Sequence, residues 1–207
     1  DLFGDQANIA TEKGILGSRS VMQDAIKQLN LQVSYFNASV FPYQPLYKKQ
    51  PFEVVIDSGS KIPVWLYDVP VAVTILENKR CKISFETEDE SGNEISYSGE
   101  HELGRQIKTK DFEFAILENP AIPVSDDHRD YEFMIHSSTK QINEYLSRLR
   151  IESPDKDATI VKLTFQDHIP VRAVDVINTL CKVYINLDIE DKTSVASLTL
   201  HFVNEQL

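Results

Sequence analysis

The first part of the chain, to about residue 36, has the hydrophobic period of helices. Apolar residues between positions 7 and 16 predict a short helix that ends near Gly17. Ser18 or Ser20 suits the N-cap of a second helix, because a serine hydroxyl accepts a hydrogen bond from an N–H group of the first turn. Alternation over residues 31–36 predicts a strand. The second helix has its apolar residues at the i, i+3, i+4, i+7 spacing of one buried face: Met22, Ala25, Ile26 and Leu29.

Between about residues 37 and 120 the apolar residues alternate with polar ones. This period of two is typical of half-buried strands. The clearest runs are residues 52–56, 69–75, 81–85 and 112–116. Turn signals rich in Ser, Gly and Asn separate these runs, so the segment is predicted to form a small antiparallel β-sandwich.

The segment from residue 121 returns to mixed structure. Alternation over residues 131–135 predicts a strand. Ser138 and Gln141 have the spacing of a capping box, which would open an amphipathic helix. Residues 159–165 are rich in β-branched side chains and predict a further strand.

The last 38 residues predict one long helix. Pro170 has the first-turn position that proline favours in helices, and no Gly or Pro follows it. Apolar residues then recur at steps of three and four, which gives the helix one continuous apolar seam. A polar stretch near Asp191 predicts a bend or a solvent-exposed turn in that helix.

These zones together predict an α+β protein with two domains. A discontinuous α/β base domain would combine residues 1–36 and 121–207, because neither part has enough strands to fold alone. Residues 37–120 would form an inserted, antiparallel β-sandwich-like domain. The chain has 207 residues, of which 42% are hydrophobic and 26% charged, enough for two small cores.

The acidic composition argues against nucleic-acid and membrane-surface binding. The formal net charge is -11, from 32 acidic and 21 basic residues. Such a surface repels phosphate backbones and anionic lipid head groups. No segment approaches the roughly 20 apolar residues that span a bilayer. The chain starts and ends inside predicted helices, which suggests that both ends were cut from a longer protein.

The two cysteines, Cys81 and Cys181, are expected to be separate buried thiols rather than a disulfide. They form no CxxC pattern and no cluster with histidine, so no zinc site is expected. The acidic loop at residues 126–130 has the residue types of a cation site. Its charge density is more typical of a solvated connection between domains, so we expect no metal there.

The sequence contains no recognisable catalytic motif. Patterns such as GxSxG, HExxH, GxGxxG and the phosphate loop are all absent. The acid pairs Glu86/Glu88 and Glu100/Glu102 have the chemistry of glycoside hydrolysis. Acids on one strand at a sheet edge more often keep that edge soluble. We therefore expect no catalytic residue and no cofactor. The five histidines fall in different elements, none in a nucleophile motif: His101, His128, His136, His168 and His201.

Three aromatic residues of the β-rich segment are candidates for stacking on sugar rings: Trp65, Tyr67 and Tyr97. An aromatic ring offers an apolar face and, in Tyr and Trp, a polar group at its edge. Packing in the core or at a sheet edge is the commoner role of such residues in a small sandwich. Sugar stacking is therefore the alternative interpretation of these three side chains.

Motifs near both ends of the chain carry a resemblance to known proteins. Residues 2–12 lead into the pattern E-x-x-I-L-x-S-R, and the stretch after residue 169 follows P-x-x-A-x-x-x-x-N-x-L. Between them, residues 46–54 and 105–114 match a subgroup that carries a β insertion. The positions that the two terminal patterns define include Ser18, Arg19, Pro170, Ala173, Asn178 and Leu180.

In their order and spacing, these motifs resemble the polysaccharide co-polymerase or chain-length determinant family. Its members are Wzz-like, or Wzc-like where a tyrosine kinase is fused. The resemblance implies a domain held between two membrane helices on the periplasmic face of the bacterial inner membrane. Such a domain would form homo-oligomers and act with polymerase and export machinery. It would set the chain length and export of exopolysaccharide, capsule or O-antigen without catalysis; a cytoplasmic kinase domain would follow in the kinase-fused branch.

Two other functions stay open on the sequence alone. In the first, the β insertion is a glycan-binding module that grips the growing polymer through its aromatic residues. In the second, which the absence of motifs disfavours, the chain is a glycosidase or other hydrolase. The three functions differ in the site they need: a self-association surface, a polar groove with aromatic side chains, or a cleft with converging acids and histidines.

Overall fold

The computed structural model describes residues 2–57, 59–124, 129–154 and 160–205. These residues form an α+β protein with four α-helices and eleven strands, and the strand pairs are antiparallel. The expected fold class is confirmed. The chain divides into two compact units: Asp1–Leu31 with Ser138–Leu207, which we call the helical unit, and Gln32–Ser137, which we call the β unit.

The helical unit contains four helices and one β-hairpin. Its elements are α1 (Leu2–Leu16), α2 (Arg19–Gln28), α3 (Ser138–Arg148), β10 (Leu149–Glu152), β11 (Lys162–Phe165) and α4 (Pro170–Glu205). Helix α2 begins as predicted, because Ser18 Oγ accepts a hydrogen bond from Val21 N at 3.3 Å. The amphipathic face of α2 packs against α3 and α4, which builds one apolar core for this unit.

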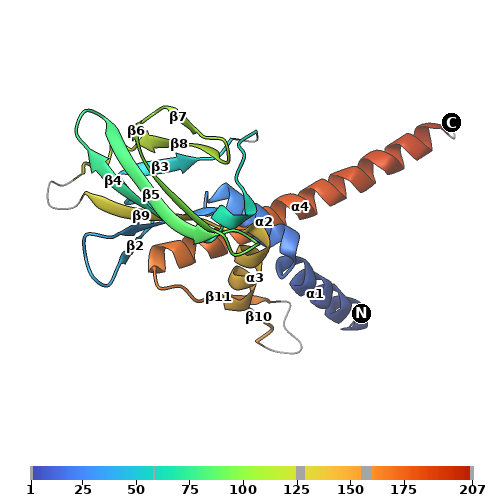
Figure 1. Ribbon diagram of the computed structural model, residues 1–207. Coiled ribbons are helices and arrows are strands. Elements are labelled where there is room, and N and C mark those ends of the chain that lie inside the picture. The colour runs from blue at the N-terminus through green and yellow to red at the C-terminus, as the bar shows by residue number, and fades with distance from the viewer. Residues whose placement is uncertain (1, 58, 125–128, 155–159, 206–207) are drawn as a thin grey trace. The chain divides into compact units, whose positions relative to one another are not determined.

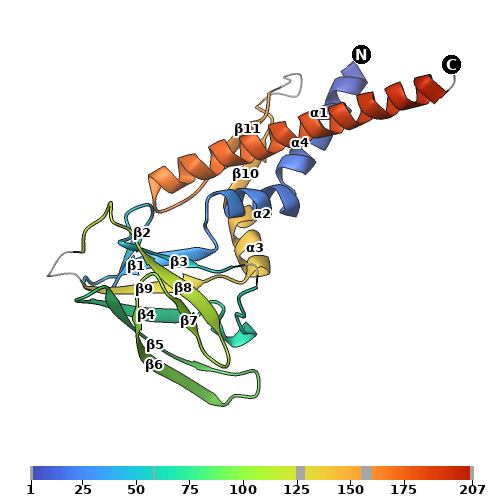
Figure 2. The same cartoon turned by 90° about the horizontal axis from the view of Figure 1, so that it is seen from above.

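Two details of the helical unit differ from expectation. Gln141 is buried, and its Nε2 donates to the carbonyl oxygen of Leu31 at 2.5 Å, so it ties α3 to the end of α2 instead of completing a capping box. Helix α4 continues through Asp191 to Glu205, and Figures 1 and 2 show it as one uninterrupted helix. The expected bend or turn near Asp191 is therefore wrong.

The β unit consists of two antiparallel sheets. Their strands are β1 (Val33–Asn37), β2 (Gln44–Leu46), β3 (Phe52–Val55), β4 (Pro70–Leu76), β5 (Arg80–Glu88), β6 (Glu94–Glu102), β7 (Gln106–Lys108), β8 (Glu113–Glu118) and β9 (Asp130–Ile135), with a 3-10 turn, η1, at Val64–Leu66. Six strands form one sheet in the order β2-β1-β9-β4-β5-β6, and three form the other in the order β3-β8-β7. The smaller sheet lies against the larger one (Figures 1 and 2).

Aromatic side chains join the two sheets into one core. Phe114 of the small sheet and Phe133 of the large sheet are both fully buried, and their rings meet edge to face at 5.6 Å. Tyr35 meets Phe52 in the same way at 5.6 Å, and its hydroxyl accepts a hydrogen bond from Val54 N at 2.9 Å. Burial raises the pKa of Tyr35 to about 12, so this cross-sheet link keeps its proton at any physiological pH.

The unit boundaries differ from those expected from the sequence. The β unit spans residues 32–137, whereas the insertion was expected at 37–120. The reason is that β1 pairs with β9, with Tyr35 opposite Phe133, and β9 pairs with β4. Two strands that were expected in the base domain thus close the sheet of the β unit. The helical unit keeps only the hairpin β10–β11.

Both cysteines are free thiols, as expected. Cys81 is buried in the β unit, and burial raises its pKa to about 11. Cys181 lies on α4 and is only half-buried, so the expectation of two buried thiols was wrong for this residue. In the described part of the chain, no helix is both long enough and apolar enough to cross a bilayer.

Candidate functional site

A polar groove lies in the β unit at the corner where β6 leads into β7. Each of these strands is the last in its own sheet. The connecting turn is fixed to both sheets, because Leu103 N donates to Lys79 O and Gly104 N donates to Ile116 O, each at 2.8 Å. Gly104 has φ +85°, a conformation that residues with a Cβ rarely adopt. The groove is thus built on ordered strands and a doubly anchored turn.

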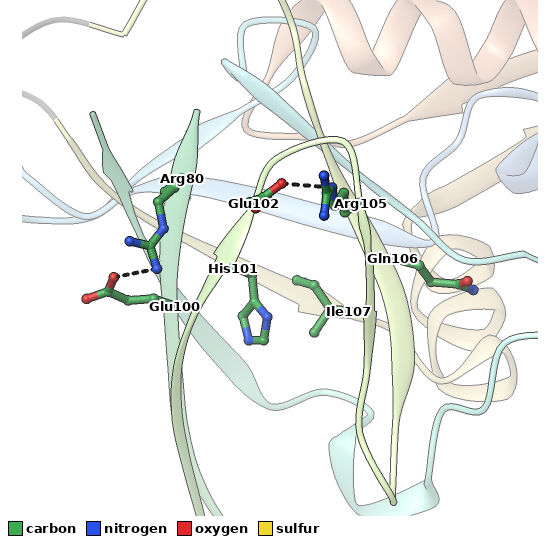
Figure 3. A pocket seen from close by; sticks show the side chains of 7 residues that line it. All are labelled: Arg80, Glu100, His101, Glu102, Arg105, Gln106 and Ile107. Carbon is green, nitrogen blue, oxygen red and sulfur yellow. Dashed lines mark ion pairs between the residues drawn. The ribbon is translucent and has the colours of Figure 1, made fainter. Parts of the chain in front are cut away.

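The groove encloses about 280 Å³ and is lined mainly by charged and polar side chains. Figure 3 shows its lining residues, which are Arg80, Glu100, His101, Glu102, Arg105, Gln106 and Ile107. Arg80 Nη2 lies 3.0 Å from Glu100 Oε2, and Arg105 Nε lies 2.7 Å from Glu102 Oε2. Two cationic and two anionic side chains give this lining no net formal charge when His101 is neutral.

The His101 imidazole is held by a hydrogen bond and a ring stack. Its Nε2 lies 2.8 Å from the Tyr97 hydroxyl, and the two rings are nearly parallel, with 13° between their planes and 6.2 Å between their centroids. Gly99 lies between them on the same face of β6, since side chains alternate along a strand. A Cβ at Gly99 would lie 2.7 Å from the Tyr97 hydroxyl oxygen and 3.0 Å from His101 Nε2. The Tyr97–His101 pair therefore requires glycine at this position.

Burial sets the protonation of this pair. It lowers the pKa of His101, so the imidazole is neutral at pH 7 and offers one donor and one acceptor nitrogen. Burial also raises the pKa of Tyr97, so its hydroxyl keeps its proton. The groove lining therefore combines a neutral, oriented imidazole with two ion pairs.

The three aromatic residues that the sequence singles out are only partly brought together. Tyr97 stacks on Phe85 at 5.6 Å, and Trp65 packs on Phe85 at 6.0 Å. Because Phe85 is only 5% exposed, Trp65 and Tyr97 do not form one open platform. Tyr67 is half-buried against the core. Tyr97 alone of the three directly contacts a residue that lines the groove.

The acidic pairs behave differently from each other. Glu100 and Glu102 line the groove and pair with arginines, on a strand that ends its sheet, where edge charges were expected. Glu86 is exposed on β5 and is not part of the lining. Sequence reasoning missed His101 and Arg105 as site residues, because His101 belongs to no catalytic motif and Arg105 was interpreted only as part of the family-like stretch 105–114.

A second constellation in the β unit links a serine, a histidine and an aspartate. Ser34 Oγ lies 2.7 Å from His136 Nε2, and His136 Nδ1 lies 3.3 Å from Asp68 Oδ1. These are the atoms that connect in the triad of serine hydrolases. The three residues come from β1, the end of β9 and the turn after η1, so no sequence motif marks them. A backbone hydrogen bond links two of these segments, since Asp68 N donates to Ile135 O at 2.7 Å.

This serine–histidine–aspartate chain has only part of what acyl transfer needs. The reaction also requires N–H donors aimed at an oxyanion and a cavity beside the nucleophile. The lining residues of the groove described above, and of the cavity described next, do not include Ser34. Within the described contacts, this chain of hydrogen bonds links three segments of the β unit.

A cavity of about 270 Å³ lies in the helical unit, beside the β10–β11 hairpin. One of its lining residues, Arg148, is 3.6 Å from Asp167, whose side chain is fully buried and accepts from Arg172 Nε at 2.7 Å. Burial alone would raise the pKa of Asp167, but hydrogen bonds from Arg172 and Ile169 N lower it. This cluster fixes the start of α4.

The positions of the two terminal motifs lie mostly at helix starts and contacts. Ser18 caps α2, the Arg19 guanidinium donates to Asn143 Oδ1 of α3, and Pro170 begins α4. Leu180 is fully buried, whereas Asn178 is exposed. Ala173, which is half-buried, donates its N–H to Ile169 O at 3.1 Å. The motifs therefore specify how the helices of this unit begin and pack.

Helix α4 also presents an exposed face with repeated aliphatic side chains. Val176, Leu180 and Val183 are buried, at 4% exposure or less. A different face carries four aliphatic residues that are 52–60% exposed: Val171, Val174, Ile185 and Ile189. We call these four the α4 stripe. They form two pairs, at steps of three and four residues, that lie eleven residues apart on one helical face and together extend over about 27 Å.

In the described residues, no group of three or more His, Cys, Asp or Glu side chains is placed to hold a metal ion. Residues 126–128 of the candidate acidic loop lie outside the described residues. Of the rest of that loop, Asp130 accepts a hydrogen bond from Thr74 Oγ1 at 2.8 Å. No protein-family model matches the chain.

Proposed function

We propose that this chain is the non-catalytic periplasmic domain of an inner-membrane polysaccharide co-polymerase. In this proposal it regulates the chain length and export of exopolysaccharide, capsule or O-antigen through oligomeric assembly. Its partners are other copies of the same domain and the polymerase and export machinery. The motif resemblance supports the family, and the α4 stripe is the observation that supports assembly.

Burial of the α4 stripe favours association between copies of the domain. Each of its four residues leaves more than half of its surface exposed. Single exposed aliphatic residues are ordinary, but a repeated row along one helix face is typical of a partner surface. Burying apolar surface contributes about 25 cal/mol per Å², so a row of four β-branched residues gives a useful gain in association. Membrane anchoring of the parent would raise the local concentration to about millimolar, where weak contacts suffice.

The test is made in the full-length parent protein, in cells that lack the chromosomal copy. Val174→Asp combined with Ile185→Asp places two charges in the proposed contact, where they lose hydration without a partner. We expect the modal glycan length to change or length control to be lost. Val64→Asp is the matched control, since Val64 is 70% exposed and lies in the β unit. Wild-type glycan length with the double variant at normal protein level would contradict the proposal.

A glycan-binding module is the second candidate function, and one observation favours it. The groove between β6 and β7 combines hydrogen-bonding side chains with a stacked Tyr97–His101 pair. These two functions are compatible, because one uses the helical unit and the other the β unit. A hydrolase would instead need chemistry at Ser34 or at the acid pairs.

A further inference from the structure

We infer that the groove between β6 and β7 binds a short segment of a neutral, hydroxyl-rich carbohydrate chain. Glu102, Arg105 and the imidazole of His101 recognise the hydroxyl groups in this inference. This inference rests on the proposed function only in taking the polymer to be the polysaccharide whose length is regulated. The class of ligand follows from the side chains of the groove itself.

The charge balance of the groove selects against ionic ligands. Its two arginines are each paired with a glutamate at 3.0 Å or less, so a phosphate or carboxylate would have to compete with the negative charge of that glutamate. An anion-binding site typically has an excess of cationic side chains. A neutral ligand with many hydroxyl groups meets no such competition.

The donors and acceptors of the groove match hydroxyl groups. The ion pairs at the rim join one carboxylate oxygen to one guanidinium nitrogen. A carboxylate has two oxygens and a guanidinium five N–H donors, so each pair has further capacity on both sides. A sugar hydroxyl donates one hydrogen bond and accepts others. Neighbouring hydroxyl groups can therefore hydrogen-bond to alternating acids and arginines. The Gln106 amide, which both donates and accepts, is a further partner.

His101 supplies the ring face against which a sugar packs, beside a buried apolar floor at Ile107. Figure 3 shows the two side chains next to each other between β6 and β7. Ile107 is 2% exposed and belongs to the core, so it supports the floor of the groove and offers almost no surface to a ligand. His101 is oriented by the Tyr97 hydroxyl at 2.8 Å. A side chain that is already ordered loses little conformational freedom when a ligand binds.

The size of the groove determines how tightly it binds. At about 280 Å³ it is slightly smaller than typical ligand sites, which range over roughly 300–1,000 Å³ for drug-sized molecules. A segment of one or two sugar units would occupy it. We expect a Kd of about 1 mM for one site, and several copies in an assembly would hold one polymer more tightly through multivalency.

The test uses the ¹⁵N-labelled 207-residue chain and a defined probe. The probe is the oligosaccharide fraction from mild hydrolysis of the surface polysaccharide of the organism that encodes the chain. Backbone amide and imidazole ¹⁵N–¹H spectra are recorded during titration. We expect saturable shifts at His101 and at residues 99–107, with an affinity that changes less than about twofold between low and 0.5 M salt, because the groove has no net charge.

Two variants and one control sharpen the result. His101→Ala and Glu102→Gln should each weaken binding about tenfold, which corresponds to 1.4 kcal/mol. Lys108→Ala is the matched control. It removes an exposed cation 3.3 Å from Glu113 on the adjacent strand, in an ion pair that is not part of the groove lining, and it should leave binding unchanged. The spectra themselves report whether each variant is folded.

Three results would overturn the inference. They are the absence of saturable shifts up to about 10 mM probe, shifts that centre on another surface, and an affinity that disappears with salt as an anion site requires. The experiment is independent of assembly. If the titration shows no binding but the α4 stripe variant changes glycan length, the groove inference is rejected and the proposed function stands. If the titration shows binding but the α4 stripe variant leaves glycan length unchanged, assembly alone is rejected.

Discussion

The two units of this protein present different kinds of surface. The helical unit offers an apolar row on α4 whose members are each more than half exposed. The β unit offers a groove of ion pairs around an imidazole. The first surface suits a contact between protein copies, and the second suits a hydroxyl-rich ligand. The comparison teaches that one chain can carry two surfaces of different chemistry on separate scaffolds.

The largest expected effect is a loss of stability in the β unit. Phe133→Ala removes a fully buried ring that packs on Phe114 at 5.6 Å. We expect the free energy of unfolding to fall by about 3–5 kcal/mol, because the deletion leaves a cavity between the two sheets. Urea denaturation followed by tryptophan fluorescence measures it, since Trp65 lies in the same unit. A fall below about 1 kcal/mol would show that the sheets do not share one core.

The next effect tests the start of α4 in the helical unit. Asp167→Asn leaves Arg172 and Arg148 without their buried carboxylate, so we expect a loss of about 3 kcal/mol at pH 7. The folded pKa of Asp167 lies below its unfolded value, which is about 3.9. The stabilisation is therefore complete above that value and is lost as pH falls through the folded pKa. The free energies of unfolding of the wild type and of Asp167→Asn, measured by unfolding curves, should converge in acid. A constant difference between them down to pH 2 would contradict this account.

A smaller effect probes the scaffold of the groove. Gly99→Ala adds a Cβ that would lie 2.7 Å from the Tyr97 hydroxyl oxygen. We expect the Tyr97–His101 hydrogen bond to break and the free energy of unfolding to fall by about 1–3 kcal/mol. The pKa of His101, measured by NMR titration, should rise toward its ordinary value as the imidazole becomes more exposed. An unchanged His101 titration would show that glycine is not needed there.

The smallest effect concerns the serine–histidine–aspartate chain. Ser34→Ala removes a half-buried hydroxyl 2.7 Å from His136 Nε2, which should cost about 0.5–1.5 kcal/mol. We expect the wild-type chain to resist labelling by a fluorophosphonate, a probe for activated serines. Covalent labelling of the wild-type protein that is lost in Ser34→Ala would identify the protein as a serine hydrolase. It would contradict a structural role for Ser34, His136 and Asp68.

Much of the fold could be predicted because most elements have a clear hydrophobic period. Helix α2 with its Ser18 cap, and strand β5 with alternating buried residues, both follow the sequence pattern. Strand β6 was anticipated only through its edge acids, Glu100 and Glu102, and not as an alternating run, because its inward positions include Gly99 and His101 where a core strand would have large apolar residues. The small and polar residues that let β6 line a groove also remove the apolar alternation by which a strand is predicted.

The remaining differences come from contacts between distant segments. The pairing of β1 with β9 joins residues about 100 positions apart, and no local pattern encodes it. Gln141 has capping-box spacing, but its amide reaches Leu31 instead. None of the expected stacking residues lines the groove; Tyr97 contacts the lining residue His101, and Phe85 packs between Tyr97 and Trp65. Local patterns define elements, whereas sites depend on how those elements meet.

The most direct test of the central claim is photo-crosslinking of the α4 stripe in native membranes. A photoreactive amino acid replaces Val174 in the full-length parent. In the control, the same photoreactive amino acid replaces Ile160, which lies in the helical unit and is 62% exposed. The account predicts a ladder of oligomers of the parent protein from position 174 and little product from position 160. Monomers alone from position 174, or equal ladders from both positions, would contradict it.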